Sequence, residues 1–261
     1  MDPTPEHVSA PPPVGIARIF GFDFRTETYQ QALEALCRQV GQRPAKVVVP
    51  LNVDCVILAD ESSETKSLYA GADYIYADGM PVIWASRLLR SPLPERVTGA
   101  DLFVSLCQRA LQHGWHVAVI GGMPGQEAML EERFSTVYPG LKASVHCPPM
   151  GFRYQGPEGV AAGEWVNRIK PDIVFVCLGF PRQERWSLDQ RERLDASVVL
   201  CCGAAMEFAL GLRSRAPVFL QRIGLEWFWR LLTEPGKLWR RYLVRGPRFV
   251  GVFWREWRQR A

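Results

Sequence analysis

Short apolar runs rich in β-branched residues alternate with helix-like segments along most of this chain, and this alternation limits its fold more than any other feature. Strands that lie between helices and are buried on both faces form mostly parallel sheets. We therefore predict an α/β fold, with a Rossmann-like, mostly parallel sheet flanked by helices. The predicted strands are 46–51, 72–77, 116–120, 142–146, 172–178 and 197–202, and the predicted helices are 56–70, 98–112, 126–137, 159–169 and one after Glu184.

Polar residues and glycines directly follow several of these apolar runs. In open parallel sheets, ligands bind beyond the carboxyl ends of the strands. We therefore expect these residues to gather at one edge of the sheet and to form a binding site. They are Asn52, Asp54, Asp78, Gly121, Gly122, Gly125, Gln183, Glu184 and Gly203.

The C-terminal fifth of the chain differs in charge from the rest. Residues 211–261 contain twelve Lys or Arg, three Asp or Glu and five of the nine Trp, so this stretch carries +9 in a chain whose net charge is +4. Such a tail suits phosphate groups or an anionic lipid surface. An amphipathic helix packed on the body, with a solvated basic face, is an equally good interpretation of the charge alone.

Composition also suggests how the chain is divided. Residues 1–14 are rich in proline and are expected to be a disordered leader. We assign 15–211 to the α/β domain and 212–261 to a helical appendage, which Ala216-Pro217 and Glu234-Pro235 divide into short helices. The first residues lack the features of a signal peptide, and no apolar run approaches the roughly 18–20 residues that a spanning helix needs.

Metal and cofactor motifs are not found in the sequence. The four His show no ligand spacing and no Asp-x-Asp occurs, so we predict no metal site. The seven Cys form no C-x-x-C pair and several lie in apolar runs, which is typical of buried thiols in a reducing compartment. Gly121-Gly-Met-Pro-Gly125 is neither a P-loop nor a complete G-x-G-x-x-G, and we predict no cofactor.

Asp78 is the candidate proton acceptor. It follows an apolar run and precedes Gly-Met-Pro. A partly desolvated carboxylate there can accept a proton from a hydroxyl nucleophile, although an aspartate that caps a helix or a turn is more common. Thr98 and Asp101 carry the same ambiguity, because they can bind substrate hydroxyls or simply begin a helix.

Two further segments are candidates for substrate contacts. Gly121, Gly122 and Gly125 let the backbone approach a ligand, and the helix N-terminus behind them offers N–H groups to a phosphate; a plain strand-to-helix turn is the alternative. Gln183 can bind sugar hydroxyls through its donors and its acceptor, or it can serve with Glu184 only as a helix cap.

Cations of the tail can replace a metal at a diphosphate. They are spaced by roughly whole helical turns, so that several can reach one anionic group. These residues are Arg230, Lys237, Arg240 and Arg241. The alternative is that they are solvated surface charges.

Taken in order, these segments resemble the WecG/TagA/CpsF family of bacterial glycosyltransferases (glycosyltransferase family 26) over about residues 15–250. The combination of Pro94-Glu-Arg-Val-Thr-Gly-Ala-Asp-Leu-Phe103 with the tail is the most specific part of the match. The other matching segments are Asn52-Val-Asp54, Ala77-Asp-Gly-Met-Pro81, 121–125, 138–141, 179–184, 215–217 and 225–242.

This resemblance implies an inverting, metal-independent glycosyltransferase. Its members move a sugar from a UDP-sugar to a polyprenyl-diphosphate-linked sugar, in the synthesis of teichoic acid, common antigen, capsule or exopolysaccharide. The resemblance implies that Asp78 is the general base, that Gln183 lies in the pocket, and that the appendage closes the site and brings Arg230, Lys237 and Arg240 to a diphosphate. It also implies a cytoplasmic protein that is peripheral on the inner face of the membrane and has no nucleic-acid partner. It does not determine the oligomeric state.

Three departures from the family leave the donor and the acceptor open. Pro50 stands where many members have Thr, Lys237 stands at an arginine position, and Gly203-Ala-Ala-Met-Glu-Phe208 replaces Gly-Gly-Thr-Phe-Asp-Phe. Glucose or another hexose is therefore as compatible as N-acetylmannosamine. Two other classes remain as alternatives: an NAD(P)-dependent oxidoreductase, and a non-catalytic basic module that binds lipid or nucleic acid.

Overall fold

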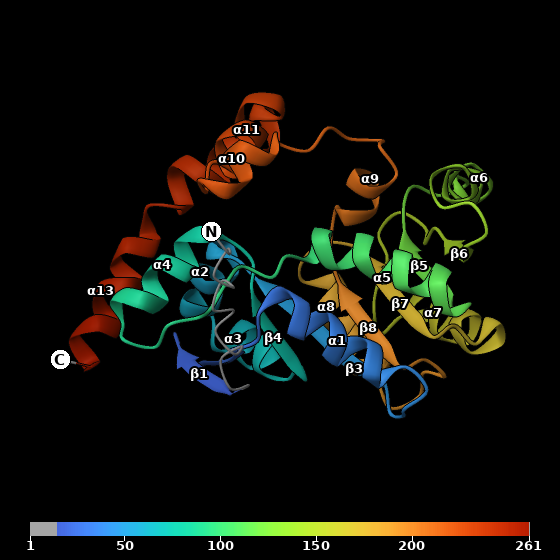
Figure 1. The fold of residues 1–261 in the computed structure, drawn as a ribbon, viewed down its shortest axis with the longest axis horizontal. Helices are drawn as coiled ribbons and strands as arrows, with labels where there is room; N and C mark the ends of the chain where they lie inside the picture. The colour runs from blue at the N-terminus through green and yellow to red at the C-terminus, as the bar shows by residue number, and fades with distance from the viewer. Residues whose placement is uncertain (1–14, 261) are drawn as a thin grey trace, which may run out of the picture.

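The computed structural model describes residues 15–260 (Figure 1). Its strands are β1 (Ile16–Ile19), β2 (Phe22–Arg25), β3 (Lys46–Leu51), β4 (Tyr74–Ala77), β5 (His116–Gly121), β6 (Lys142–His146), β7 (Ile173–Cys177) and β8 (Val198–Cys201). Its helices are α1 (Tyr29–Gln39), α2 (Val53–Glu61), α3 (Ser63–Ala70), α4 (Met80–Leu88), α5 (Gly99–His113), α6 (Glu127–Val137), α7 (Pro157–Ile169), α8 (Arg182–Gln190), α9 (Ala205–Ala209), α10 (Val218–Arg222), α11 (Glu226–Thr233), α12 (Pro235–Trp239), the π-helix η1 (Arg240–Arg245) and α13 (Arg248–Arg260).

The main sheet has six strands in the order β4-β3-β8-β7-β5-β6, and every pair in it is parallel. This confirms the predicted α/β fold with a parallel, Rossmann-like sheet. All six predicted strands are present, within a few residues of the expected bounds. The long predicted helix 56–70 is instead two helices, because Ser62 adopts an extended conformation and caps α3 through Thr65 N.

Successive residues of each central strand enter opposite cores, as a pleated strand requires. Val47 and Val49 of β3 pack in one cluster with residues of α2, α3, α4, α7 and α8. Val48, between them, packs in the other cluster with residues of α1, α5 and α6. Helices therefore cover both faces of the sheet, and the carboxyl edge is left to the loops (Figure 1).

A small hairpin precedes the main sheet. β1 and β2 pair in antiparallel fashion, and the turn between them is Phe20-Gly21, with φ of 55° and 79°. Two consecutive positive φ values are typical of the tight turns that match the strand twist, and a glycine accepts such a conformation without strain. The sequence analysis missed this hairpin, because four-residue strands carry little periodic signal, and it also missed α1.

The C-terminal helices return to the N-terminal part of the chain. Val252 of α13 is buried in the first core cluster, and the Phe249 ring packs edge-on against Phe20 with centroids 5.5 Å apart. Figure 1 shows α13 in red beside α2 and α4. α11 ends at Thr233 and α12 begins at Pro235, which confirms that Glu234-Pro235 divides the tail.

The structure does not test two expectations about domain organisation. The leader 1–14 lies outside the described residues, and the division at 211/212 stays a prediction. Within residues 15–260, no helix has both the length and the apolarity needed to cross a bilayer.

Candidate active site at the carboxyl edge of the sheet

Asp78 lies directly beyond β4, at the carboxyl edge of the sheet. Its backbone N–H donates to the carbonyl of Leu51 at 2.8 Å, which fixes it beside the end of β3. Gly79, with φ of 139°, is the N-cap of α4 and no side chain caps this helix. The Asp78 carboxyl accepts a hydrogen bond from the backbone N–H of Gly99, the first residue of α5.

The surroundings of Asp78 make its carboxylate more basic than usual. Burial raises its pKa from 3.8 to about 6, and the negative charges of Glu226 and Asp101 raise it as well. The Arg96 guanidinium and the Gly99 N–H act in the opposite direction. A carboxylate with this pKa is ionised at neutral pH and still accepts a proton readily, which is the property a general base needs.

An ion-pair network around Asp78 joins the tail to the body. Arg96 Nη1 lies 3.1 Å from Glu226 Oε2 on α11, and Arg96 Nη2 lies 3.8 Å from Asp101 Oδ2. Arg215 Nη1 lies 2.6 Å from Asp101 Oδ1, and Arg215 Nε lies 3.7 Å from Glu226 Oε1. The Asp78 carboxylate interacts electrostatically with Arg96, Arg215 and Arg241, and also with Asp101 and Glu226.

Thr98 and Asp101 begin α5. Thr98 is buried; its Oγ1 accepts from Asp101 N at 3.0 Å and donates to Asp101 Oδ2 at 2.7 Å. Burial acts to raise the pKa of Asp101, but the hydrogen bonds from Arg215 and Thr98 outweigh it and the pKa is lowered. The helix-start interpretation thus describes both residues in this structure, and Asp101 also holds a cation.

Asn52 and Asp54 lie at the start of α2, beside β3, and both contact the tail. Asn52 Oδ1 caps the helix by accepting from Asp54 N at 3.0 Å, and it also accepts from Arg241 Nη2 at 3.2 Å. Asp54 is bridged by two arginines of η1, with Arg241 Nε at 3.1 Å and Arg245 Nη1 at 2.8 Å. Two predicted substrate contacts are therefore occupied by the protein's own guanidinium groups.

The glycine loop follows β5, as predicted. A Cβ on Gly121, whose φ is 157°, would lie 2.6 Å from Cys177 Cβ, so the loop backbone is packed against the end of β7. Gly122 is equally tight, with a Cβ position 2.7 Å from Leu130 Cδ1. Gly125 has open space around it, and α6 begins two residues later without a side-chain cap. Its first N–H groups remain available to an anion.

Gln183 and Glu184 are both buried at the start of α8. Gln183 Oε1 accepts from the backbone N–H groups of Gly179 and Gly203, each at 3.1 Å, and its Nε2 donates to Glu184 Oε1 at 2.8 Å. Burial raises the pKa of Glu184 to about 7. The Gln183 amide thus ties the loops after β7 and β8 together at the carboxyl edge.

The predicted cations of the tail lie on three different elements. Arg230 of α11 sits over the Phe208 ring, 5.7 Å from its centroid, and its buried Nε has no hydrogen-bond partner among residues 15–260. Arg240 is exposed and lies over Trp239 at 5.3 Å. The side chain of Lys237 lies outside the described part of the structure. The break at Glu234-Pro235 means that whole-turn spacing does not place these residues on one helix face.

Sequence reasoning did not select several residues that the structure brings to the site. They are Arg96, Arg215, Glu226 and Arg245. Arg96 and Arg215 stand inside recognised motifs, so a closer reading of those motifs was the available signal. Glu226 likewise stands inside the matching segment 225–242, whereas Arg245 is recognisable only from contacts across the fold. The described residues contain no group of three or more His, Cys, Asp or Glu arranged to hold a metal.

Comparisons with known proteins agree with this picture. A family model described as "Glycosyl transferase WecG/TagA/CpsF family" matches residues 17–261. The chain is 31% identical, over 202 residues, to an N-acetylglucosaminyldiphosphoundecaprenol N-acetyl-beta-D-mannosaminyltransferase of Bacillus spizizenii, which covers 77% of this chain and 76% of that protein. The chain therefore belongs to the WecG/TagA/CpsF family of glycosyltransferases.

Proposed function

We propose that this protein moves a hexose or N-acetylhexosamine from a UDP-sugar to a polyprenyl-diphosphate-linked sugar, with inversion at the anomeric carbon, in the synthesis of a bacterial cell-surface polysaccharide. The observation that carries this proposal is the carboxyl of Asp78. Its pKa is raised to about 6, and its charge interacts with two residues of the tail, Glu226 and Arg241. In the proposed reaction Asp78 takes the proton from the acceptor hydroxyl as that oxygen attacks the sugar.

The leaving diphosphate needs positive charge at the same edge. Arg230 supports this role, because it has no carboxylate partner among the described residues and lies over the Phe208 ring of α9, the helix that follows β8. We assign Lys237 and Arg240 to the same diphosphate or to that of the lipid, as the resemblance implies. The uncapped start of α6 beyond Gly125 suits a phosphate of the donor.

The acceptor assignment rests on the relative from Bacillus spizizenii. Its name states that it acts on N-acetylglucosaminyldiphosphoundecaprenol. A membrane-bound acceptor of that kind requires the enzyme to approach a lipid surface, and the tail supplies a basic, apolar face for it. The exposed apolar side chains of the tail include Phe219, Ile223, Trp227, Phe228, Leu232, Trp239, Leu243, Trp254 and Trp257. We therefore place the protein on the inner face of the cytoplasmic membrane, as a peripheral protein.

The donor sugar remains open within the hexose class. Pro50, which replaces a family Thr, has its ring carbon 3.4 Å from the position of a Cβ on Gly99, next to the residue that donates to Asp78. Glu207, which replaces a family Asp, is 3.0 Å from Arg213. These substitutions leave glucose or another hexose as compatible with the site as N-acetylmannosamine.

A UDP-release assay tests the proposal. The full-length protein is incubated with each of several UDP-sugars and a synthetic polyprenyl-diphosphate sugar, with and without lipid vesicles. We expect acceptor-dependent UDP release with one donor, and a glycosidic product of inverted configuration. Release with none of the donors, or a retained configuration, would contradict the proposal. Saturable binding of NAD(P) would instead support the oxidoreductase alternative.

A further inference from the structure

Two cysteine thiols meet at the carboxyl edge of the sheet. Cys177 is the last residue of β7 and Cys202 directly follows β8, and their Sγ atoms lie 3.6 Å apart. The register of these neighbouring parallel strands pairs Val176 with Cys201, so the two cysteines that come next lie side by side. Neighbouring strands are about 4.8 Å apart, which is within the range of Cα separations that a disulfide spans. Because bonded sulfurs lie about 2.05 Å apart, closing the bond requires a further approach of about 1.5 Å.

Both thiols lie on one face of the sheet. Successive strand residues enter opposite cores, and Cys177 and Cys202 both pack against the cluster that contains residues of α1, α5 and α6. Cys201 enters the other core, where its Sγ lies 3.4 Å from Ser187 Oγ. Cys201 is therefore directed away from the pair, although it precedes Cys202 in the sequence.

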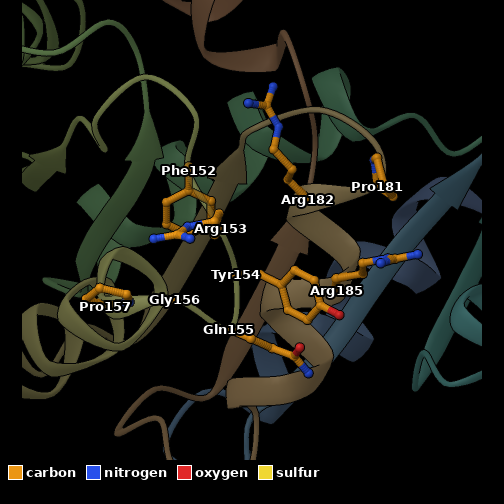
Figure 2. A pocket seen from close by; sticks show the side chains of 9 residues that line it. All are labelled: Phe152, Arg153, Tyr154, Gln155, Gly156, Pro157, Pro181, Arg182 and Arg185. Atoms are coloured by element: carbon orange, nitrogen blue, oxygen red, sulfur yellow. The ribbon is translucent and has the colours of Figure 1, made fainter.

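The cleft beside the start of α8 is separate from the thiol pair. It has a volume of about 520 Å³, and Phe152, Tyr154 and Arg185 are among the residues that line it (Figure 2). Phe152 and Tyr154 belong to the core on the α7 and α8 face, which is the face opposite the thiols. The neighbours through which the pair can influence the site are therefore those on the α5 face.

Cys202 contacts the residue that supports Asp78. A Cβ on Gly99 would lie 3.3 Å from both Cα and Cβ of Cys202, so α5 begins in close contact with this cysteine. The backbone N–H of Gly99 donates to the Asp78 carboxyl. Cys177 has less freedom to move, because a Cβ on Gly121 would lie only 2.6 Å from Cys177 Cβ. The movement that closes the distance between the sulfurs therefore falls mainly on Cys202 and changes its contact with Gly99.

The same two cysteines stand at the beginning of two loops that share one amide. Gly179, two residues after Cys177, donates its N–H to Gln183 Oε1 at 3.1 Å. Gly203, directly after Cys202, donates to the same oxygen at 3.1 Å. A bond between the thiols would therefore alter the geometry of both loops at the carboxyl edge.

The pair is also accessible to a small oxidant. Cys177 and Cys202 are partly exposed, whereas Cys107, Cys147 and Cys201 are buried. Thiols in a reducing compartment stay reduced, and the disulfides that do form there are usually transient and catalytic or redox-sensing. A close, partly exposed pair of this kind has the geometry of such a reversible disulfide.

We propose that Cys177 and Cys202 form a redox-sensitive dithiol that a peroxide converts to a disulfide, and that this disulfide lowers the activity of the site around Asp78. The effect on activity rests on the proposed function, whereas the formation of the disulfide is independent of it. The signal passes from Cys202 to Gly99, which donates to Asp78, and from Gly203 to the Gln183 amide.

The oxidation is a two-electron reaction in two steps. One sulfur attacks a peroxide oxygen and the O–O bond breaks; the thiol proton joins the departing oxygen, and the products are a sulfenic acid and water. The second sulfur attacks the sulfenic sulfur, so that the S–S bond forms and the S–O bond breaks. The second thiol proton leaves with that hydroxyl as another water. Two thiols are oxidised to one disulfide, and one hydrogen peroxide is reduced to two waters.

Mass spectrometry tests the disulfide without any activity assay. Reduced full-length protein is treated with hydrogen peroxide, the remaining thiols are alkylated, and the protein is digested with trypsin without reduction. We expect the peptides 169–182 and 194–213 to be linked, and dithiothreitol to separate them. The second peptide contains both Cys201 and Cys202. Cys201→Ser should therefore keep the link, and Cys202→Ser should abolish it.

The effect on the site is measured as the ratio of UDP release after and before peroxide treatment. In the wild type this ratio should fall about tenfold or more, because a misplacement of about 1 Å can lower a rate about 10²-fold. Dithiothreitol should restore it. Cys37→Ser, which removes a partly exposed thiol of α1, should respond as the wild type does. Cys202→Ser should keep whatever rate it has before treatment.

Hydrogen exchange gives a second measure of the effect on the site. The amides of 99–103 should exchange faster in the oxidised wild type than in the reduced protein, because the contact between Cys202 and Gly99 changes. Cys202→Ser should show no such difference. If the reduced protein releases no UDP, the proposed function is contradicted, and the peptide link and this exchange still decide whether the dithiol exists and reaches the site.

Two results would contradict the dithiol. Oxidation of Met150, which is 75% exposed, shows that the peroxide has acted. If the two peptides remain unlinked under that condition, or remain linked in Cys202→Ser, the assigned pair is wrong. If the linked wild type retains both its UDP release and its exchange at 99–103, the disulfide does not regulate the site.

Discussion

Arg241 Nε lies 3.1 Å from Asp54 Oδ2, so a residue near the end of the chain is held at the first turn of α2. The same guanidinium donates through Nη2 to Asn52 Oδ1 at 3.2 Å. Asn52 and Asp54 were expected to contact substrate, and here they contact the tail. A substrate that uses either side chain must therefore displace Arg241 or bind alongside it.

The first prediction concerns this contact. Arg241→Gln should loosen η1 and α12 from the body, since Asp54 then keeps only Arg245. We expect faster hydrogen exchange and faster proteolysis within 235–247. Arg258→Gln, which removes an exposed arginine stacked on Trp254, is the control and should leave both rates unchanged. Equal rates in the Arg241 variant and the wild type would show that the contact does not hold the tail.

The second prediction concerns proton transfer. Asp78→Asn should lower turnover about 10²–10⁴-fold, because an amide cannot accept the proton. In the wild type kcat/KM should fall as pH drops below about 6, where the Asp78 carboxyl becomes protonated. This acidic limb should be missing from the residual activity of the variant. Glu164→Gln, at an exposed position on α7, should retain both the wild-type turnover and the fall of kcat/KM below about pH 6.

The third prediction concerns stability and follows from the same pKa. The folded state holds the Asp78 proton up to about pH 6, whereas the unfolded chain loses it near 3.8. The contribution of Asp78 to the free energy of unfolding therefore falls as pH rises from about 3.8 to about 6. Asp78→Asn removes this loss, so the variant should melt at a higher temperature than the wild type at about pH 8. The difference should shrink toward zero near pH 4, as thermal scans across pH can measure.

The fourth prediction separates charge from geometry at Arg230. Arg230→Lys keeps the cation but loses the planar fork that matches phosphate oxygens, so we expect about a tenfold lower kcat/KM. Arg230→Gln should be lower still. The same change at Arg258, in α13, should have no effect on kcat/KM in the UDP-release assay. A fully active Arg230→Gln variant would remove this residue from the mechanism.

The fifth prediction tests the core beneath the carboxyl edge. Trp186 is fully buried and its Nε1 donates to the Gly159 carbonyl at 2.9 Å, which joins α8 to α7. Trp186→Phe loses this bond and leaves space, so it should lower the free energy of unfolding by about 1–3 kcal/mol in denaturant titrations. Trp257→Phe, at an exposed position, should change it by less than about 0.5 kcal/mol.

Much of the fold could be predicted because its strongest signals are local. The strand 116–121 is a short apolar run with clear breakers, and Thr98 is a capping residue whose hydrogen bond lies within one turn. The position of Asp78 beyond a strand was likewise evident from order along the chain. Local sequence determines these features, so local reasoning was sufficient.

The remainder depends on contacts between distant segments. Glu226 pairs with Arg96 across the fold, and Arg241 reaches Asn52 in the same way. Charge composition shows that the tail is basic, but it does not show which guanidinium meets which carboxylate. Arg230 and Arg241 appeared equivalent in the sequence; in the structure one lies over Phe208 and the other at α2, because a helix break separates them.

The packing of α13 on the hairpin has a consequence for how the protein is made. The side chain of Arg260 donates to the backbone carbonyl of Arg18, 242 residues away, and Phe249 covers Phe20. At a synthesis rate of about 5–20 residues per second, the hairpin waits roughly 10–50 s for its cover to leave the ribosome. During that interval the aromatic face of the hairpin is exposed and can bind chaperones. In translation products that lack α13, this face should stay exposed.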